Sequence, residues 1–170
     1  SGFAMSDFIF VSCVSQMKVA QERLLASPCL QSGGHRLIMH VNAPSAASAV
    51  NAVLDSRPSA RWLVWLHQDV FLPQGWDHLL ATRLKEAAAR WPHIAVAGVY
   101  GVKGSGPSAV RAGHVLDRGR LLREAAPLPH EVDALDELLF AMRTDVPLRL
   151  DPALGFDFYA TDLVLQAQAA

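Results

Sequence analysis

Short apolar runs of strand length alternate with segments of helical pattern along the chain, and this alternation limits the fold more than any other feature. The expected strands are residues 8–14, 36–41, 61–66, 94–100 and 137–142. The expected helices are residues 16–26, 45–54, 75–90 and 156–170. Strands that alternate with helices are typical of βαβ units around a parallel sheet. The sequence therefore predicts an α/β fold of three layers, α/β/α, with a mainly parallel central sheet.

Local signals predict where several of these elements begin or end. Pro28 should stop the helix over residues 16–26, because proline interrupts the hydrogen bonds of a helix interior. Ser45 is a candidate N-cap for the next helix, since its hydroxyl can accept a hydrogen bond from a free backbone amide. Residues 137–142 suit a strand or a helix, and we favour the strand.

The middle of the chain departs from the alternating pattern. Residues 101–113 hold four glycines and a proline and show no apolar period, which predicts a loop or an excursion from the sheet. Residues 115–122 then favour a short hairpin. We expect no regular part of the main sheet between these positions.

Length and charge exclude several classes of protein. The 170 residues suit one globular domain, which we assign to residues 7–170, with residues 1–6 as a remnant of cloning or a flexible N-terminus. The 15 Lys and Arg residues are scattered and are opposed by 16 Asp and Glu residues, so we expect no nucleic-acid partner. No apolar run approaches the roughly 20 residues that a membrane span needs.

The chain has two cysteines, Cys13 and Cys29. They show no C-x-x-C spacing of a metal site and are too few for a disulfide scaffold, so the expected compartment is a reducing cytoplasm. Residues 163–170 end within a helical pattern that lacks a stop signal, which leaves open a longer natural chain.

Polar residues follow the most apolar expected strand, at its carboxyl end. His67, Gln68 and Asp69 come directly after residues 61–66. Ligands of open α/β sheets bind beyond the carboxyl ends of strands. A carboxylate there can share a divalent cation with a diphosphate, because hard cations take oxygen ligands from both. Asp69 is the first candidate ligand and His67 the second; the equally compatible alternative is that His67 and Asp69 only cap the following turn.

Four separated stretches resemble family 2 glycosyltransferases with the GT-A fold, particularly the bacterial glycosyltransferase-like branch. They are residues 45–51 with 62–69, residues 70–76, residues 132–143 and residues 154–163. The resemblance covers nearly the whole chain in the right order, although each motif alone is weak. It implies a GT-A-like fold and transfer of a sugar from a nucleotide-diphospho-sugar to a glycan or other acceptor hydroxyl. It also implies assistance by Mn²⁺ or Mg²⁺ and inversion at the anomeric carbon.

Two positions depart from the pattern of that family. The Asp-x-Asp motif reads His67-Gln68-Asp69, and imidazole is a poorer ligand than carboxylate for these cations. The position of the catalytic base is Ala160, so the nearest acids are Asp157 and Asp162. These two point about 140° apart on a helix, so at most one faces the acceptor. We favour Asp157 as the base, with a helix N-cap as the equally weighted alternative.

The resemblance also implies further site residues. The backbone around Ser12, Cys13 and Ser15 is expected to surround the nucleoside at the end of the first strand, and His67 and Gln68 are expected donor contacts. Asn42 and Asn51 are expected donor contacts as well; a turn residue before Pro44 is the alternative for Asn42, and an exposed helix residue for Asn51.

On the acceptor side, the resemblance implies roles for an acidic pair and for an arginine that follows. Asp136 is a further candidate acid, and Glu137 and Arg143 are expected to bind the acceptor. A solvated surface position is the alternative for both acids.

The remaining sequence features favour no other enzyme class. His35, His78, His93 and His130 have no partner at ligand spacing and are expected at the surface or in turns. The chain lacks a G-x-G-x-x-G after a strand, a G-x-S-x-G elbow and an H-E-x-x-H motif. Two alternatives to a transferase stay open: a non-catalytic nucleotide- or sugar-binding module that kept the fold, and an unrelated Rossmann-like enzyme.

Overall fold

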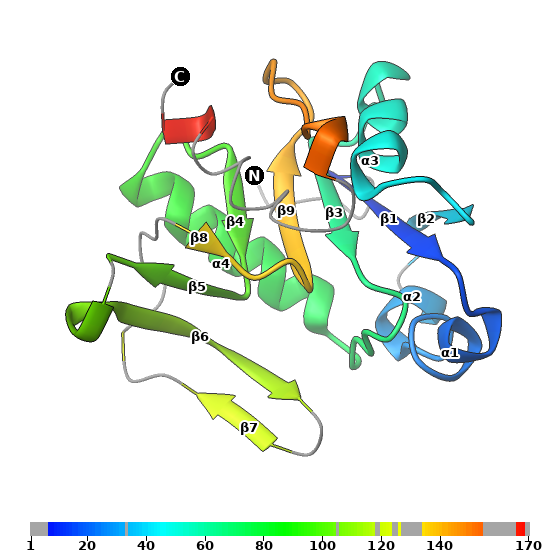
Figure 1. Cartoon of the computed structure of the whole chain (residues 1–170), viewed down its shortest axis with the longest axis horizontal. Coiled ribbons are helices and arrows are strands. Elements are labelled where there is room, and N and C mark those ends of the chain that lie inside the picture. Colours follow the sequence, from blue (N-terminus) through cyan, green and yellow to red (C-terminus); the bar gives the residue numbers. More distant parts are fainter. Residues whose placement is uncertain are drawn as a thin grey trace.

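The computed structural model describes residues 7–32, 34–104, 106–117, 120–123, 126, 134–154 and 166–168. Its main sheet has five strands in the order β2-β1-β3-β9-β4 (Figure 1). Their bounds are β1 (Phe8–Val14), β2 (Arg36–Val41), β3 (Trp62–Leu66), β4 (Val96–Gly98) and β9 (Leu139–Arg143).

The sheet is mainly parallel, as the sequence predicts. Strand β1 pairs in parallel with both β2 and β3, whereas β9 runs antiparallel to β3 and to β4. Because β4 is antiparallel to an antiparallel strand, it runs in the same direction as the first three. Four of the five strands therefore point one way, and their carboxyl ends lie at one edge of the sheet.

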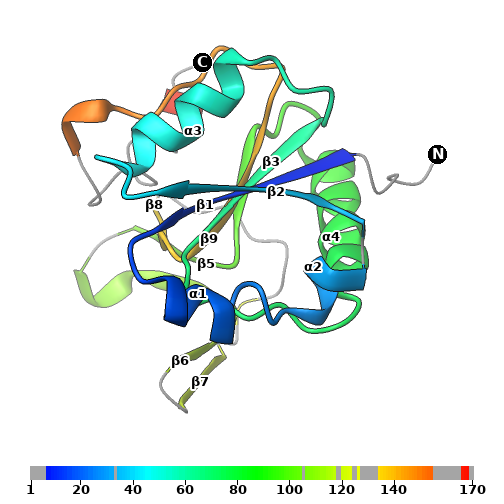
Figure 2. The same ribbon diagram turned by 90° about the vertical axis from the view of Figure 1, so that its right-hand side faces the viewer.

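Helices cover both faces of this sheet, which confirms the three-layer α/β/α fold. Helix α3 (Ala46–Asp55) lies on one face, and α2 (Pro28–Ser32) and α4 (Trp76–Arg90) lie on the other (Figure 2). Alternate side chains of β1 pack on opposite faces of the sheet. Ile9 and Val11 pack with α3, while Phe8 and Phe10 pack toward α2 and α4. All five residues of β3 are buried, as expected for a strand covered on both faces.

The ends of the helices confirm one expected boundary and correct another. The Ser45 hydroxyl accepts a hydrogen bond from the Ser48 backbone N–H at 3.0 Å, so it caps α3 as predicted. The helix expected over residues 16–26 is only α1 (Met17–Glu22), and Pro28 begins α2 instead of ending α1. Proline suits the first turn of a helix, where its missing N–H would have no partner inside the helix.

Residues 101–113, predicted as a loop or an excursion from the main sheet, form such an excursion and belong to a second sheet. It consists of β5 (Tyr100–Lys103), β6 (Val110–Asp117), β7 (Arg120–Arg123) and β8 (Ala134–Leu135), in the order β7-β6-β5-β8 (Figure 1). Strands β5 and β6 form an antiparallel pair around a short 3₁₀ helix, η2 (Gly106–Ser108). Gly104 and Gly106 have φ of +80° and +64°, so the glycines mark the turn between two strands.

Three further expectations concern the late and middle strands. The hairpin at residues 115–122 is confirmed, because Val115 pairs with Leu122 across β6 and β7. The strand favoured over residues 137–142 is confirmed as β9, which starts two residues later. The strand expected over residues 94–100 is divided between β4 and the first residue of β5.

The last part of the chain is described only in pieces. The 3₁₀ helix η3 (Pro152–Leu154) follows β9, and residues 166–168 are helical. The rest of the helix expected over residues 156–170 lies outside the described residues. In the described part of the chain, no helix combines the length and apolar character that crossing a bilayer requires.

Candidate functional site

A cleft opens at the carboxyl ends of β1, β2 and β3, and its cavity measures about 680 Å³. Loops that follow neighbouring parallel strands meet at the same edge of a sheet, so the cleft collects residues that are far apart in the sequence. Six of the predicted site residues line it together: Cys13, Ser15, Asn42, His67, Gln68 and Asp69. The structure therefore brings most of the expected donor side and the expected metal ligands into one place.

The side chain of Gln68 joins the loop after β3 to the loop after β1. Its Oε1 accepts hydrogen bonds from the backbone N–H groups of Ser15 and Gln16, at 3.1 and 3.0 Å. Its Nε2 donates to the Ser15 hydroxyl at 3.1 Å. Both ends of the amide are thus bound by protein groups, so Gln68 holds one wall of the cleft in position.

His67 lies between aromatic and acidic neighbours at the mouth of the cleft. Its ring meets the Trp65 ring edge to face, with the centroids 6.2 Å apart, and its backbone N–H donates to the Leu138 carbonyl. Burial lowers the pKa of His67, and the carboxylates of Asp69 and Asp136 offset this only in part. The imidazole is therefore neutral at neutral pH, and the exposed Asp69 carboxylate beside it leaves this part of the cleft negative.

The end of β1 presents a thiol that is not ionised. Cys13 is half-buried, and its Sγ lies 3.9 Å from the Ser45 carbonyl oxygen. Burial raises the pKa of Cys13 to about 11, so the group is neither a nucleophile nor a thiolate at neutral pH. Its neighbour Ser12 is fully buried and does not line the cleft, so the expected donor contact of Ser12 does not come from its side chain.

Asn42 forms the turn after β2 and lines the cleft as well. Its φ is +54°, in the left-handed region that asparagine tolerates better than most residues, and its N–H donates to the Val14 carbonyl at 2.9 Å. Asn42 is thus a turn residue, as one interpretation predicts, and it also lies at the site, as the other requires.

Asn51 lies in α3 and binds the backbone of the segment after β9, and it does not line the cleft. Its Nδ2 donates to the Leu150 carbonyl, and its Oδ1 accepts from the Leu150 N–H, both at 2.9 Å. These bonds use both polar groups of the amide and attach the segment after β9 to the helix. Asn51 is absent from the lining of the cleft, so the donor contact expected of it is not supported.

We expect Asn51→Ala to lower the free energy of unfolding by about 1–3 kcal/mol, because the buried N–H and C=O of Leu150 lose their partners. Asn51→Asp should lose less, since it keeps the acceptor but not the donor. Urea denaturation measures both variants. A loss below about 0.5 kcal/mol for Asn51→Ala would contradict this role.

The acceptor-side residues are divided between the two ends of β9. The Asp136 carboxylate accepts from the Leu138 N–H at 2.8 Å, and the Glu137 carbonyl accepts from Trp65 Nε1 at 3.2 Å, so both residues adjoin the cleft. Arg143 pairs with Trp62 in the sheet, at the far end of β3. Its guanidinium binds the Asp145 carboxylate through two hydrogen bonds. The structure therefore does not bring Arg143 and Glu137 together at the cleft.

The two candidate bases and four predicted surface histidines remain to be placed. Asp157 and Asp162 lie outside the described residues, as does His130. His78 and His93 are exposed, in agreement with the sequence analysis. His35 is not a surface or turn residue: only 1% of its side chain is exposed, and Nε2 lies 2.7 Å from Asp77 Oδ2.

Five further residues line the cleft beyond those predicted from the sequence. They are Val14, Gln16, Val19, Ala43 and Trp65. Strand alternation places Trp65 on the same face as His67, and this signal was available in the sequence. Val14, Gln16 and Ala43 are direct neighbours of predicted residues in the sequence. Val19 lies one helical turn after Ser15.

Comparison with known proteins adds one positive finding. Residues 9–170 match the model of a glycosyltransferase-like family. No curated protein matches the sequence. The matched span contains every residue of the cleft and, apart from Phe8, every residue of both sheets.

Proposed function

The chain belongs to the glycosyltransferase-like family, and on this premise we propose that its cleft binds a nucleotide-diphospho-sugar, whose sugar the protein transfers to an acceptor hydroxyl. The observation that carries the proposal is the convergence of Ser15, Asn42 and residues 67–69 around one cavity. Its volume of about 680 Å³ lies within the range of small-molecule sites. We treat residues 7–170 as the single domain that performs this reaction.

On the donor side, the wall held by Gln68 faces the place proposed for the nucleotide. The loop of Ser15 and Gln16 borders this place from β1, and Asn42 borders it from β2. Trp65 and Val19 supply apolar surface for the flat parts of the ligand. Cys13 contributes shape and a weak donor, since its thiol stays protonated.

The chemistry of residues 67–69 fits a divalent cation held mainly by one carboxylate. Asp69 is exposed and anionic, His67 is neutral, and the amide of Gln68 is already bound by Ser15 and Gln16. Mn²⁺ suits this mixed set of oxygen and nitrogen ligands, and Mg²⁺ suits the carboxylate alone. When bound, such a cation neutralises charge on the diphosphate leaving group.

Inversion at the anomeric carbon requires a base on the acceptor. In a single displacement, the acceptor oxygen forms a bond to this carbon while the bond to the diphosphate oxygen breaks, and the hydroxyl proton passes to a carboxylate. Asp157, Asp162 and Asp136 are the proposed acids. Of these, Asp136 is the one that the structure describes, and its charge acts on His67 at the cleft. Glu137 is proposed to bind the acceptor beside it.

The proposal predicts that one nucleoside diphosphate stabilises the protein and that Mn²⁺ enlarges the effect. A ligand at about 100 times its Kd adds about 2.7 kcal/mol, which raises Tm by about 5–10 °C for a chain of this size. Thermal-shift titrations with UDP, GDP, CDP and dTDP, each with Mn²⁺ or with a chelator, measure this shift.

The variant Gln68→Ala tests where the nucleotide binds. It removes three hydrogen bonds between the two loops, so it should weaken the binding of that nucleotide by about tenfold. The absence of a shift with all four nucleotides would contradict the donor site. Tight binding of a nucleotide-sugar without its hydrolysis or transfer would instead favour the non-catalytic module.

A further inference from the structure

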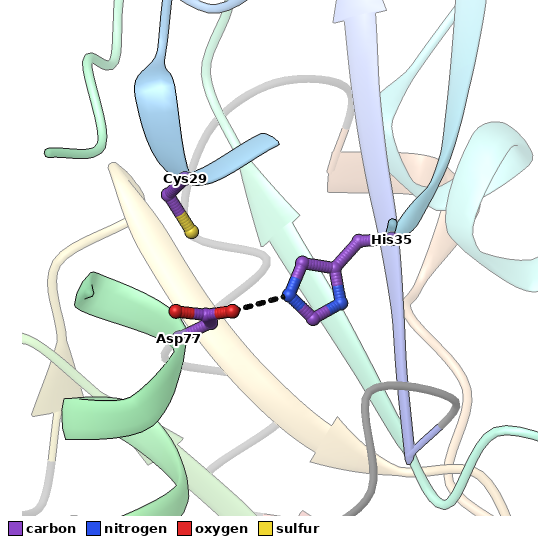
Figure 3. A group of neighbouring side chains, drawn as sticks. All are labelled: Cys29, His35 and Asp77. Carbon is purple, nitrogen blue, oxygen red and sulfur yellow. Dashed lines mark hydrogen bonds and ion pairs between the residues drawn. The ribbon is translucent and has the colours of Figure 1, made fainter. Parts of the chain in front are cut away.

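Three potential metal ligands lie together at the end of the sheet that is remote from the cleft. Cys29 belongs to α2, His35 directly precedes β2, and Asp77 lies in the first turn of α4 (Figure 3). Strand β2 leads from His35 to Asn42 at the cleft, and seven residues of extended chain span about 23 Å. This group is therefore separate from the cleft and independent of the function proposed for it.

The three side chains point toward one another inside the protein. One ligand atom from each lies within 4.8 Å of the other two. The closest pair is His35 Nε2 and Asp77 Oδ2, at 2.7 Å, and Figure 3 shows the Cys29 sulfur facing the same carboxylate. The exposed fraction is 1% for Cys29 and for the His35 side chain, and 8% for the Asp77 side chain. The group is thus compact and almost fully buried, and Asp77 is its most exposed member.

We propose that Cys29, His35 and Asp77 bind a zinc ion that links α2, β2 and α4. Thiolate, imidazole and carboxylate are the three ligand types that zinc takes in proteins, and sulfur disfavours Mg²⁺ and Ca²⁺. Zinc at about 2.0–2.3 Å from its ligands keeps tetrahedral ligand atoms roughly 3.4–3.6 Å apart. To reach this spacing, the contact between His35 and Asp77 must open by less than about 1 Å, and a pair at the 4.8 Å limit must close by about 1.2 Å.

Charge also favours an ion of two positive charges at this place. The thiolate of Cys29 and the carboxylate of Asp77 carry two negative charges when they bind, so zinc leaves the buried group neutral. Binding releases the thiol proton and any proton shared by His35 and Asp77. A water molecule completes the tetrahedron, as is usual where the protein supplies three ligands.

Neighbouring groups already hold the three ligands in orientation. The second oxygen of Asp77 accepts from the His78 N–H at 2.9 Å. The rings of Phe8 and Phe10 pack on the His35 ring, with centroids 6.1 and 5.1 Å away. The Cys29 N–H donates to the Leu72 carbonyl, which ties the short α2 to the segment before α4. Such contacts around metal ligands set their geometry and raise affinity.

Metal titration of the 170-residue chain, after treatment with a chelator, tests the proposal without any variant. We expect one equivalent of Co²⁺ to produce the sulfur-to-cobalt charge-transfer band of a bound thiolate, and zinc to displace it. Zinc should also raise Tm, because a ligand that binds only the folded state stabilises it. Binding of less than a stoichiometric amount, or cobalt binding without the sulfur band, would overturn the proposal.

The two cysteines provide a matched pair of variants. Cys29→Ser should weaken zinc binding by about 100-fold or more, because it replaces a ligand, whereas Cys13→Ser should leave zinc affinity unchanged. Circular dichroism and urea denaturation establish that both variants fold. Loss of the cobalt band in Cys13→Ser would place the metal in the cleft and would contradict the site proposed here, as would unchanged affinity in Cys29→Ser.

Discussion

Replacing Asp69 by alanine should lower kcat for sugar transfer by about 10²–10³-fold, the scale of losing one electrostatic group that faces the leaving charge. Asp69 is the exposed carboxylate at the mouth of the cleft, beside a neutral His67. Without it, the proposed cation has one neutral imidazole left to hold it. The Mn²⁺-dependent part of the nucleotide-induced Tm shift should disappear as well.

The measurement is release of the nucleoside diphosphate from the matching nucleotide-sugar, with water as acceptor until the natural one is identified. Asp55→Ala is a suitable control, because Asp55 is also an exposed aspartate but lies at the far end of α3, paired with Arg149. It should keep its activity. If Asp69→Ala keeps more than about a third of kcat, the role proposed for Asp69 in holding the cation is wrong.

The part of the site that could be predicted follows from the direction of parallel strands. Apolar runs over residues 8–14, 36–41 and 61–66 predict three strands of one sheet, and each is followed by polar residues. Since these strands run in the same direction, the polar residues after them meet at one edge. No contact between distant residues was needed for this prediction, which is why Ser15, Asn42 and Asp69 were found.

Arg143 shows what an apolar run cannot reveal. The run that forms β9 predicts a strand but not its direction, and the expected role of Arg143 requires its carboxyl end to lie at the cleft. Strand β9 is antiparallel to β3, so its amino end lies at the cleft and Arg143 at the opposite edge. The direction depends on how the second sheet returns the chain to the first, and the sequence predicts that segment only as a loop or an excursion.

His35 and Asn51 fail for another reason, which is distance along the chain. His35 contacts Asp77, 42 residues later, and Asn51 contacts Leu150, 99 residues later. A single histidine or asparagine has no local pattern that reveals such a partner. Burial and pairing of these polar groups depend on how helices pack on the sheet, so spacing in the sequence could not find them.

The largest loss of stability is expected for Phe140→Ala. Phe140 is fully buried at the centre of β9, where it is the register partner of Trp65 in β3 and of Gly98 in β4. Removing its ring leaves a cavity among residues that α3 also contacts, and such changes cost about 3–5 kcal/mol. The free energy of unfolding of a domain is about 5–15 kcal/mol, so this variant would lose a large fraction of it. Urea denaturation and Tm should both report the loss, the latter as a drop of roughly 10 °C.

Phe71→Ala is the matched control, because about half of the Phe71 side chain surface is exposed and its loss should cost less than about 1 kcal/mol. Equal losses in the two variants would show that β9 is not part of the core. The test also bears on the cleft, since the Leu138 carbonyl just before β9 accepts the N–H of His67. A loosened β9 should therefore weaken nucleotide binding at temperatures where the variant is still folded, even though Phe140 itself does not line the cleft.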